Sequence, residues 1–116
     1  MAPRTTGGRG SQAVSLSAGI VLADNFTLAP FALFIDHLRL AADESDRSRP
    51  IRCTWQVMSA RVDPVRASCG VPVGRTSGLL DPATLDYVVV VGGLLHVGQQ
   101  VDAATLDYLK QAARCC

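Results

Sequence analysis

Apolar residues along the chain fall into runs whose spacing predicts alternating strands and helices. The run Gly19–Ala23 is short, continuous and rich in β-branched residues, which is typical of a buried strand. After the polar turn Asp24–Thr27, residues 28 to about 43 follow the 3.6-residue period of a helix. The main apolar face of this helix is formed by Phe31, Phe34, Ile35, Leu38, Ala41 and Ala42.

The same helix carries a second, weaker apolar stripe on its opposite side. Asp36 falls on this stripe. Because a helix that is apolar on two sides is usually covered on two sides, we predict that it lies against a sheet and against a second surface. The stripe consists of Ala29, Ala32, Leu33 and Leu40.

The middle of the chain predicts a loop, two strands and a hairpin. Residues 43–50 form a charged loop, and residues 51–60 alternate as a half-covered strand does. Residues 65–73 are extended but interrupted by glycine and proline, which suits a hairpin at a sheet edge. The β-branched run Tyr87–Val91 is typical of a central parallel strand that is buried on both faces.

A short repeat frames the last predicted strand. Asp81–Tyr87 and Asp102–Tyr108 are identical at six of seven positions. In each copy the first Asp is a plausible N-cap, and Pro82 suits the first helical position. We predict that the first copy is one turn leading into the strand and that the second opens a helix. The packing face of that helix would consist of Leu106, Leu109 and Ala113.

This order of elements predicts an open α/β sheet with right-handed crossovers. A fold of this class usually places further parallel strands beyond its central one, and the sequence offers none after Tyr87–Val91. We therefore expect the sheet to be incomplete at its C-terminal end. Residues 1–13, which are rich in Gly, Arg, Thr and Ser, are expected to be a flexible leader.

Composition fits one ordinary globular domain. The 116 residues are 48% hydrophobic and 18% charged, which excludes disorder and a coiled coil. A net charge of +1 gives no general attraction to nucleic acid. No apolar run reaches the roughly 18 residues that a membrane helix needs. Arg4 and Arg9 precede the apolar stretch 13–23, so a secretory signal is an alternative, although Ser15, Ser17 and Gly19 dilute that stretch.

The cysteines favour a reducing, cytoplasmic compartment. Cys53, Cys69, Cys115 and Cys116 include no C-x-x-C pair and no regular disulfide framework. The last two could join His37 and His96 at a zinc ion, but the histidine spacing matches no zinc-finger pattern. We favour simple thiols, and we predict neither a metal nor a cofactor. Cys69 lies between extended segments rather than at a strand-to-helix turn, so we interpret it as structural.

Candidate chemistry is concentrated after the last strand. Gly92 and Gly93 follow it directly, and paired glycines let backbone N–H groups approach a ligand closely at the carboxyl end of a strand. A tight strand exit explains the pair equally well. His96, three residues on, is a candidate acid, base or ligand contact. The sequence contains no complete catalytic set and no phosphate-binding or nucleophile-elbow motif.

Several ordered segments resemble a known family. Residues 19–41, 55–60, 64–70 and 88–96 resemble the N-terminal domain of GlxA-type, AraC-family transcriptional regulators. That domain is PfpI-like and belongs to the class I glutamine amidotransferase-like superfamily. The resemblance runs from about residue 16 to the end. It implies a flavodoxin-like fold, an open and mostly parallel sheet with flanking helices, for residues 14–116.

The resemblance also implies roles for particular residues. Asp36 falls where the superfamily has an acidic residue, commonly Glu, facing a cysteine at a nucleophile elbow, and Gly92 and Gly93 fall at the glycine pair bordering the same pocket. The elbow and the paired helix-turn-helix motifs would follow the last residue present. The implied function is that of a truncated, non-enzymatic sensing and dimerising module for an unknown small-molecule effector.

Such a module would form a homodimer through its α/β domain, would reach DNA only through an absent C-terminal domain, and would have no contact with a membrane. The alternative is a fragment of a PfpI-like hydrolase, amidase or glyoxalase. A small secreted or structural protein is a third possibility.

Overall fold

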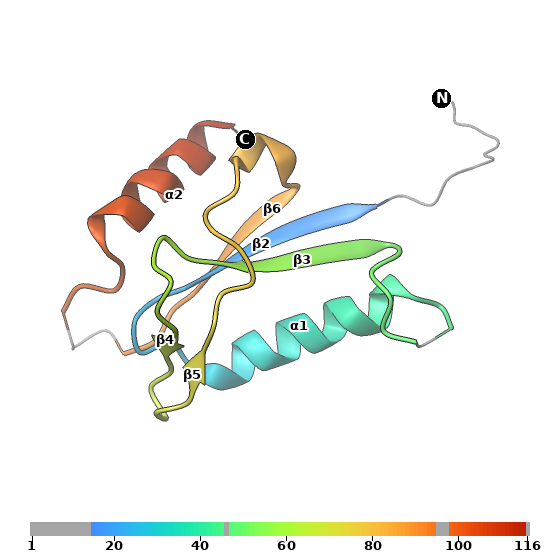
Figure 1. Cartoon of the computed structure of the whole chain (residues 1–116), viewed down its shortest axis with the longest axis horizontal. Helices are drawn as coiled ribbons and strands as arrows, with labels where there is room; N and C mark the ends of the chain where they lie inside the picture. Colours follow the sequence, from blue (N-terminus) through green and yellow to red (C-terminus); the bar gives the residue numbers. More distant parts are fainter. Residues whose placement is uncertain (1–14, 46, 95–97, 116) are drawn as a thin grey trace.

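The computed structural model describes residues 15–45, 47–94 and 98–115. Its main sheet is parallel and has the strand order β3-β2-β6. Helices lie on both sides of this sheet (Figure 1). The chain therefore has an open, flavodoxin-like α/β fold, as the sequence predicts.

The elements are β2 (Leu16–Leu22), α1 (Leu28–Ala42), β3 (Cys53–Met58), β4 (Val65–Arg66), β5 (Pro72–Val73), the 3-10 turn η1 (Pro82–Thr84), β6 (Tyr87–Val91) and α2 (Ala103–Cys115). The predicted leader lies outside the described residues.

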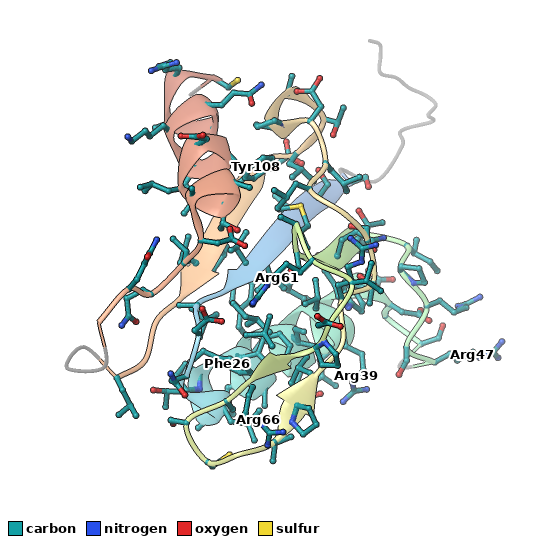
Figure 2. The ribbon with its side chains drawn as sticks, turned by 60° about the vertical axis from the view of Figure 1, so that its left-hand side comes forward. Phe26, Arg39, Arg47, Arg61, Arg66 and Tyr108 are labelled. Carbon is teal, nitrogen blue, oxygen red and sulfur yellow. The ribbon has the colours of Figure 1, made fainter. Side chains whose placement is uncertain are left out.

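The sheet separates two hydrophobic clusters. Because successive side chains of a strand point to opposite faces, Ile20 and Leu22 of β2 pack toward α1, whereas Val21 packs toward α2. Phe26 is fully buried in the α1 cluster, and Tyr108 belongs to the α2 cluster (Figure 2). Each helix therefore closes its own face of the sheet.

Helix α1 packs on the sheet through the face that its periodicity predicts. Phe31 is buried, and Phe34 and Ile35 pack against the same cluster. The Phe31 ring meets the edge of Phe26, with 5.7 Å between the ring centroids. The second stripe is exposed in this chain, and Leu33 keeps 59% of its surface accessible. Whether another surface covers that stripe stays a prediction.

The prediction for β6 is wrong in its position. The strand is parallel, but β2 is the central strand and β6 lies at the edge of the described sheet. Tyr87 is 59% exposed and Val90 is 46% exposed. A β-branched run indicates a strand with strong extended preference, but strand order depends on pairing between distant segments. The central position belongs to β2, whose last five residues are all buried.

The packing face predicted for α2 is confirmed at Leu109, which packs against the α2 cluster, but its centre is shifted by about one residue. The buried residues are Thr105, Tyr108 and Ala112, whereas Leu106 is 43% exposed. The phenol hydroxyl of Tyr108 donates a hydrogen bond to the Leu80 carbonyl oxygen. A tyrosine can bury its ring and still satisfy its polar end, and this sets the face of the helix.

The connections agree with the sequence. Residues 65–73 form the expected hairpin, in which β4 and β5 are antiparallel. The charged loop after α1 is held by Asp43, which is buried. The Arg49 guanidinium, whose Nε lies 2.7 Å from an Asp43 carboxylate oxygen, holds the pKa of that carboxyl well below its usual range. No helix among the described residues is long and apolar enough to cross a membrane.

Candidate functional site

The carboxyl ends of the three parallel strands meet at one edge of the sheet. Asp24 and Asn25 follow β2, Arg61 comes three residues after β3, and Gly92 and Gly93 follow β6. In open α/β sheets this edge is where ligands bind. The chemistry available to the fold is therefore concentrated here, in two neighbouring groups of residues.

The glycine pair holds the end of β6 against the turn after β2. The Thr27 N–H donates to the Gly92 carbonyl oxygen at 2.9 Å, and the Leu94 N–H donates to the Asn25 carbonyl oxygen at 3.3 Å. A Cβ at Gly93 would lie 1.8 Å from the Asn25 carbonyl oxygen, so no larger residue fits this backbone. Gly92 faces open space, with nothing within 4 Å of a Cβ built there. Gly93 is thus explained by packing, while Gly92 is free to border a ligand.

A groove opens beside this pair, between the first half of α1 and β6. Phe34 and Pro30 supply apolar contact surface, and Thr27 supplies a hydroxyl. Asp36 is not among the residues that line this groove. The lining residues are Thr27, Pro30, Phe34, Val89, Val90, Val91, Gly92 and Gly93.

The structure places the other predicted site residues elsewhere. The side chain of Asp36 is 63% exposed on α1 and forms an ion pair with Arg39, with 3.4 Å between Oδ1 and Nε. His96 lies outside the described residues. The joint action of these two residues with the glycine pair stays a prediction.

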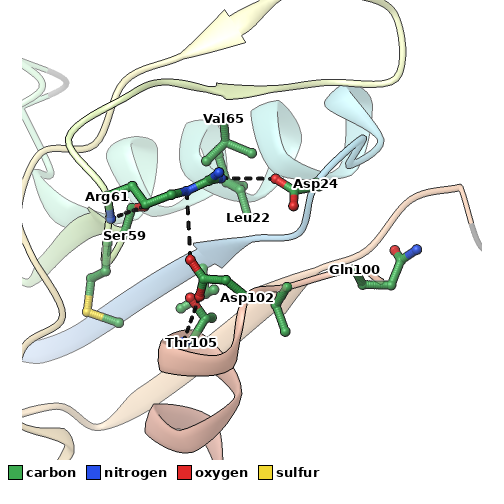
Figure 3. A pocket seen from close by; sticks show the side chains of 11 residues that line it. Leu22, Asp24, Ser59, Arg61, Val65, Gln100, Asp102 and Thr105 are labelled. Carbon is green, nitrogen blue, oxygen red and sulfur yellow. Dashed lines mark hydrogen bonds and ion pairs between the residues drawn. The ribbon is translucent and has the colours of Figure 1, made fainter. Parts of the chain in front are cut away.

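A second group of residues is centred on Arg61 and was not predicted from the sequence. Arg61 Nη2 lies 3.1 Å from Asp24 Oδ1, and Arg61 Nε lies 3.8 Å from Asp102 Oδ2 (Figure 3). The other oxygen of Asp102 accepts a hydrogen bond from the Thr105 N–H at 2.8 Å, which caps α2. Hydrogen bonds from Thr105, followed by the charge of Arg61, lower the pKa of the Asp102 carboxyl. Asp24 and Arg61 directly follow predicted strands and Asp102 is the predicted N-cap of the last helix, but no local pattern indicated that the three meet.

The Arg61 group joins three segments of the chain through ion pairs, and it is not suited to act as an acid or a base. An arginine stays protonated, and the lowered pKa keeps Asp102 ionised. The three charges join the end of β2, the turn after β3 and the start of α2. Beneath them lie Leu22, Met58 and Val65.

Three of the four cysteines lie among the residues that the structure describes. Cys53 is buried in β3, while Cys69 in the hairpin turn and Cys115 at the end of α2 are exposed, and all three are free thiols. Across residues 15–45, 47–94 and 98–115, no three His, Cys, Asp or Glu side chains are grouped as a metal site would need. Cys116 and His96, which the zinc alternative requires, lie outside those ranges.

Comparison with known proteins finds similarity to transcriptional regulators. No protein-family model matches the chain. The HTH-type transcriptional regulator GbdR of Pseudomonas aeruginosa, in two strains, is 31% identical over 98 residues, which cover 84% of this chain and 26% of GbdR. The chain thus spans about a quarter of the length of the curated relatives that it matches.

A solved structure has the same fold. The crystal structure of an AraC family transcriptional regulator from Pseudomonas putida matches with a TM-score of 0.60 and 23% sequence identity. The matched part covers 86% of this chain and 51% of that chain. The curated relatives that this chain matches are therefore regulators of transcription, and the solved structure shares its fold.

Proposed function

We propose that this chain is the N-terminal, ligand-sensing and dimerising part of an AraC-family transcriptional regulator of the GlxA type, with a PfpI-like fold, and that it acts in the cytoplasm. The observation that carries this proposal is the sequence match to a regulator, which extends over most of the chain. In this role the chain binds no DNA itself, because DNA contact belongs to a helix-turn-helix part of the whole protein. It catalyses no reaction.

The effector is proposed to bind in the groove beside Gly92 and Gly93, with His96 as a further candidate contact and with Asp36, which lies on the same helix but does not line the groove, as a candidate outside it. The groove offers the apolar surface of Phe34 and the hydroxyl of Thr27. A small molecule with an apolar part and one or two polar groups suits such a lining. Because this lining suits many small molecules of that kind, the test uses a panel of compounds.

The ligand is tested by thermal unfolding of the purified chain against a panel of small carboxylates, amines, amides and sugars. A true effector raises the midpoint temperature, and above its dissociation constant the shift keeps growing with the logarithm of its concentration, because it binds only the folded state. Gly92→Val narrows the groove and should abolish this shift. Gly74→Val is the matched control, since a Cβ at either position meets nothing within 4 Å. A shift that survives in Gly92→Val rejects the groove as the binding site.

The absence of catalysis and DNA binding is tested directly. Thiol-dependent hydrolysis, methylglyoxal consumption and a gel shift at low salt should all be silent with the purified chain. Turnover that Cys69→Ala abolishes would support the PfpI-like enzyme instead, because it would require an activated thiolate in the hairpin.

A further inference from the structure

The turn after β2, residues 23–27, is bonded to the ends of two other strands. The Thr27 N–H donates to the Gly92 carbonyl oxygen after β6 at 2.9 Å, and the Asn25 N–H donates to the Arg66 carbonyl oxygen of β4 at 3.0 Å. Thr27 also lines the groove described above. A ligand in that groove would therefore contact a turn whose backbone is held on two sides.

At its other end the same turn is linked to α2. The Asp24 N–H donates to the Gln100 carbonyl oxygen at 2.7 Å, and Asp24 Oδ1 lies 3.1 Å from Arg61 Nη2. Arg61 Nε in turn lies 3.8 Å from Asp102 Oδ2, and Asp102 caps the helix (Figure 3). The link through Gln100 stops two residues before this cap. Arg61 therefore joins the turn to the first turn of α2.

The backbone at Asn25 directs the two ends of the turn to different neighbours. Its φ of 60° lies in the left-handed region, which asparagine adopts more readily than most residues. Asp24, on one side of it, pairs with Arg61, whereas Thr27, on the other side, lines the groove. The Asn25 carbonyl group packs closely against Gly93, so the turn has little room to deform internally. A shift on the groove side is therefore passed to Asp24.

The link through Arg61 is exposed enough to open and close. The side chains of Arg61, Asp24 and Asp102 are 48%, 43% and 37% accessible. Ion pairs of this exposure contribute little stability and are screened by salt, so their partners exchange with water at low cost. The backbone of Arg61 is fixed nonetheless, because its N–H donates to Ser59 Oγ at 3.1 Å. Only the guanidinium group has to move.

We propose that Arg61 couples the groove to α2. A ligand that holds the turn after β2 also holds Asp24, which keeps the guanidinium against Asp102 and stabilises the first turn of the helix. This inference rests on the proposed ligand sensing and assigns the route by which binding reaches a second element, since no described α2 residue lines the groove. The element with two states is the Arg61 side chain, either paired or hydrated. The coupling is reciprocal, so a stable first turn of α2 favours the ligand-bound turn.

The link from Asp24 to α2 is tested by amide hydrogen exchange of the purified chain, measured by NMR. The Thr105 N–H donates to Asp102 Oδ1 and the Leu106 N–H donates to the Asp102 carbonyl oxygen, so both report opening of the first turn. We expect Asp24→Asn to raise both exchange rates about twofold or more. In an Arg61→Gln background the same change should have no further effect, because the link is already absent.

Two controls accompany this double-mutant cycle. Arg66→Gln removes a guanidinium that bonds to the Gly70 carbonyl oxygen within the hairpin, and it should leave the α2 exchange rates unchanged. The Arg52 N–H, which donates to the Ala42 carbonyl oxygen at the last residue of α1, reports opening elsewhere and should be unaffected in every variant. Slower α2 exchange in Asp24→Asn would show that Asp24 competes with the helix cap for Arg61, and it would overturn the inference. An equal effect of Asp24→Asn in both backgrounds would overturn it as well.

The link from the turn itself is tested at Asn25. Asn25→Ala strains the left-handed backbone, whereas Asn25→Gly adopts the same φ without strain and is the matched control. We expect only Asn25→Ala to raise the α2 exchange rates, and we expect this increase to disappear with Arg61→Gln. An increase that persists with Arg61→Gln would assign the coupling to the backbone of Gln100 and would overturn the role of Arg61. Circular dichroism checks that each variant is folded.

Salt provides a test that does not depend on the folding of the Asn25 variants. In about 1 M NaCl the Debye length is about 3 Å, which weakens exposed ion pairs. The α2 exchange rates of the unsubstituted chain should then rise, while those of Arg61→Gln should not. Equal salt dependence of the two chains would overturn the inference.

The outcomes separate this inference from the proposed function, because no effector enters these experiments. Loss of the coupling leaves ligand sensing in place and removes only the route through Arg61. A panel of compounds that shifts no midpoint temperature rejects the ligand in the groove, and it leaves the measured coupling between the turn and α2 as it is.

Discussion

The two copies of the seven-residue repeat, Asp81–Tyr87 and Asp102–Tyr108, begin alike and fold differently. Asp81 accepts a hydrogen bond from the Ala83 N–H at 3.0 Å, and Asp102 accepts one from the Thr105 N–H at 2.8 Å. The first copy makes a single 3-10 turn and enters β6, whereas the second continues as α2. Both segments are therefore capped by their first Asp, through the N–H two residues on in the first copy and three residues on in the second, and they continue into different structures.

The residues that follow each copy decide the difference. Tyr87 is followed by four valines, whose β-branched side chains favour an extended backbone. Tyr108 is followed by Leu, Lys, Gln and two Ala, which are good helix formers. The two tyrosines therefore lie in different environments: Tyr87 in the strand is 59% exposed, whereas Tyr108 in the helix is only 7% exposed. A capping residue marks where a turn starts but does not specify what grows from it.

The largest contrast is expected when each tyrosine is truncated. Tyr108→Ala should destabilise the chain by about 3–5 kcal/mol, because it leaves a cavity between α2 and the sheet. Tyr87→Ala should cost about 0.5 kcal/mol or less, since that ring is largely exposed. Urea denaturation followed by circular dichroism measures both. Equal losses would show that the burial of the two rings is not what separates the copies.

A smaller contrast is expected at the caps. Asp102→Ala should cost about 1–2 kcal/mol, because it uncaps a full α-helix. Asp81→Ala should cost about 0.5 kcal/mol, since it caps a single turn. Arg61 adds little to the difference, because its ion pair with Asp102 is long, at 3.8 Å, and both side chains are partly exposed to solvent. Urea denaturation measures the stability of both variants. A larger loss of stability in Asp81→Ala than in Asp102→Ala would contradict the prediction that the helix depends more on its cap than the single turn does.

The contribution of the Asp102 cap should depend on pH. The folded-state pKa of Asp102 is lower than the ordinary aspartate value of 3.8, so the unfolded state binds a proton first as the pH falls. The stabilisation is therefore fully present above pH 3.8 and is lost as the pH falls through the folded-state pKa. The stability gap between the unsubstituted chain and Asp102→Asn should be constant from pH 7 to pH 5 and should shrink below pH 3.8. A gap that stays constant in acid contradicts the lowered pKa.

Removing only the hydroxyl groups should give a contrast of about 1 kcal/mol. Tyr108→Phe leaves the Leu80 carbonyl oxygen without its donor, and the loss of one such hydrogen bond costs about 1 kcal/mol. Tyr87→Phe is the control, and it should leave the midpoint of urea denaturation unchanged. A neutral Tyr108→Phe would mean that the ring alone fixes α2.

The smallest effect is expected when the two copies are made identical. Ala103→Pro gives the second copy the sequence of the first. Proline is favourable at the first helical position and reduces the entropy of the unfolded chain, so we expect a stabilisation of about 0.5 kcal/mol with unchanged helix content. Loss of the helical signal would show that the second position of the repeat, rather than the residues that follow it, selects the structure.

The repeat also shows how far the sequence could predict the fold. The strands, α1, the hairpin and the start of α2 follow from local patterns, and all of them are present. The position of β6 beside β2 does not follow from local patterns. A run of valines indicates that the backbone is extended, but it does not indicate which strands lie next to it. The centre of the packing face of α2 was missed because the period was assigned to Leu106 and Leu109, whereas Tyr108 is the larger buried side chain.

The candidate site divides in the same way. The glycine pair could be predicted because it directly follows an obvious strand. The Arg61 group could not, because Asp24, Arg61 and Asp102 are far apart in the sequence and meet only after the strands are aligned. Local sequence therefore identifies single residues of a site, while the three-dimensional fold determines which of them meet.

The position of β2 in the sheet has a consequence for synthesis on the ribosome. β2 is made first of the three parallel strands, yet its neighbour β6 begins much later, and Ser17 and Asp86, which bond to each other, are 69 residues apart. Contacts of such separation form slowly. During translation the apolar segment Leu16–Leu22 therefore leaves the ribosome before its partner strands are made, and its side chains stay exposed until those strands follow.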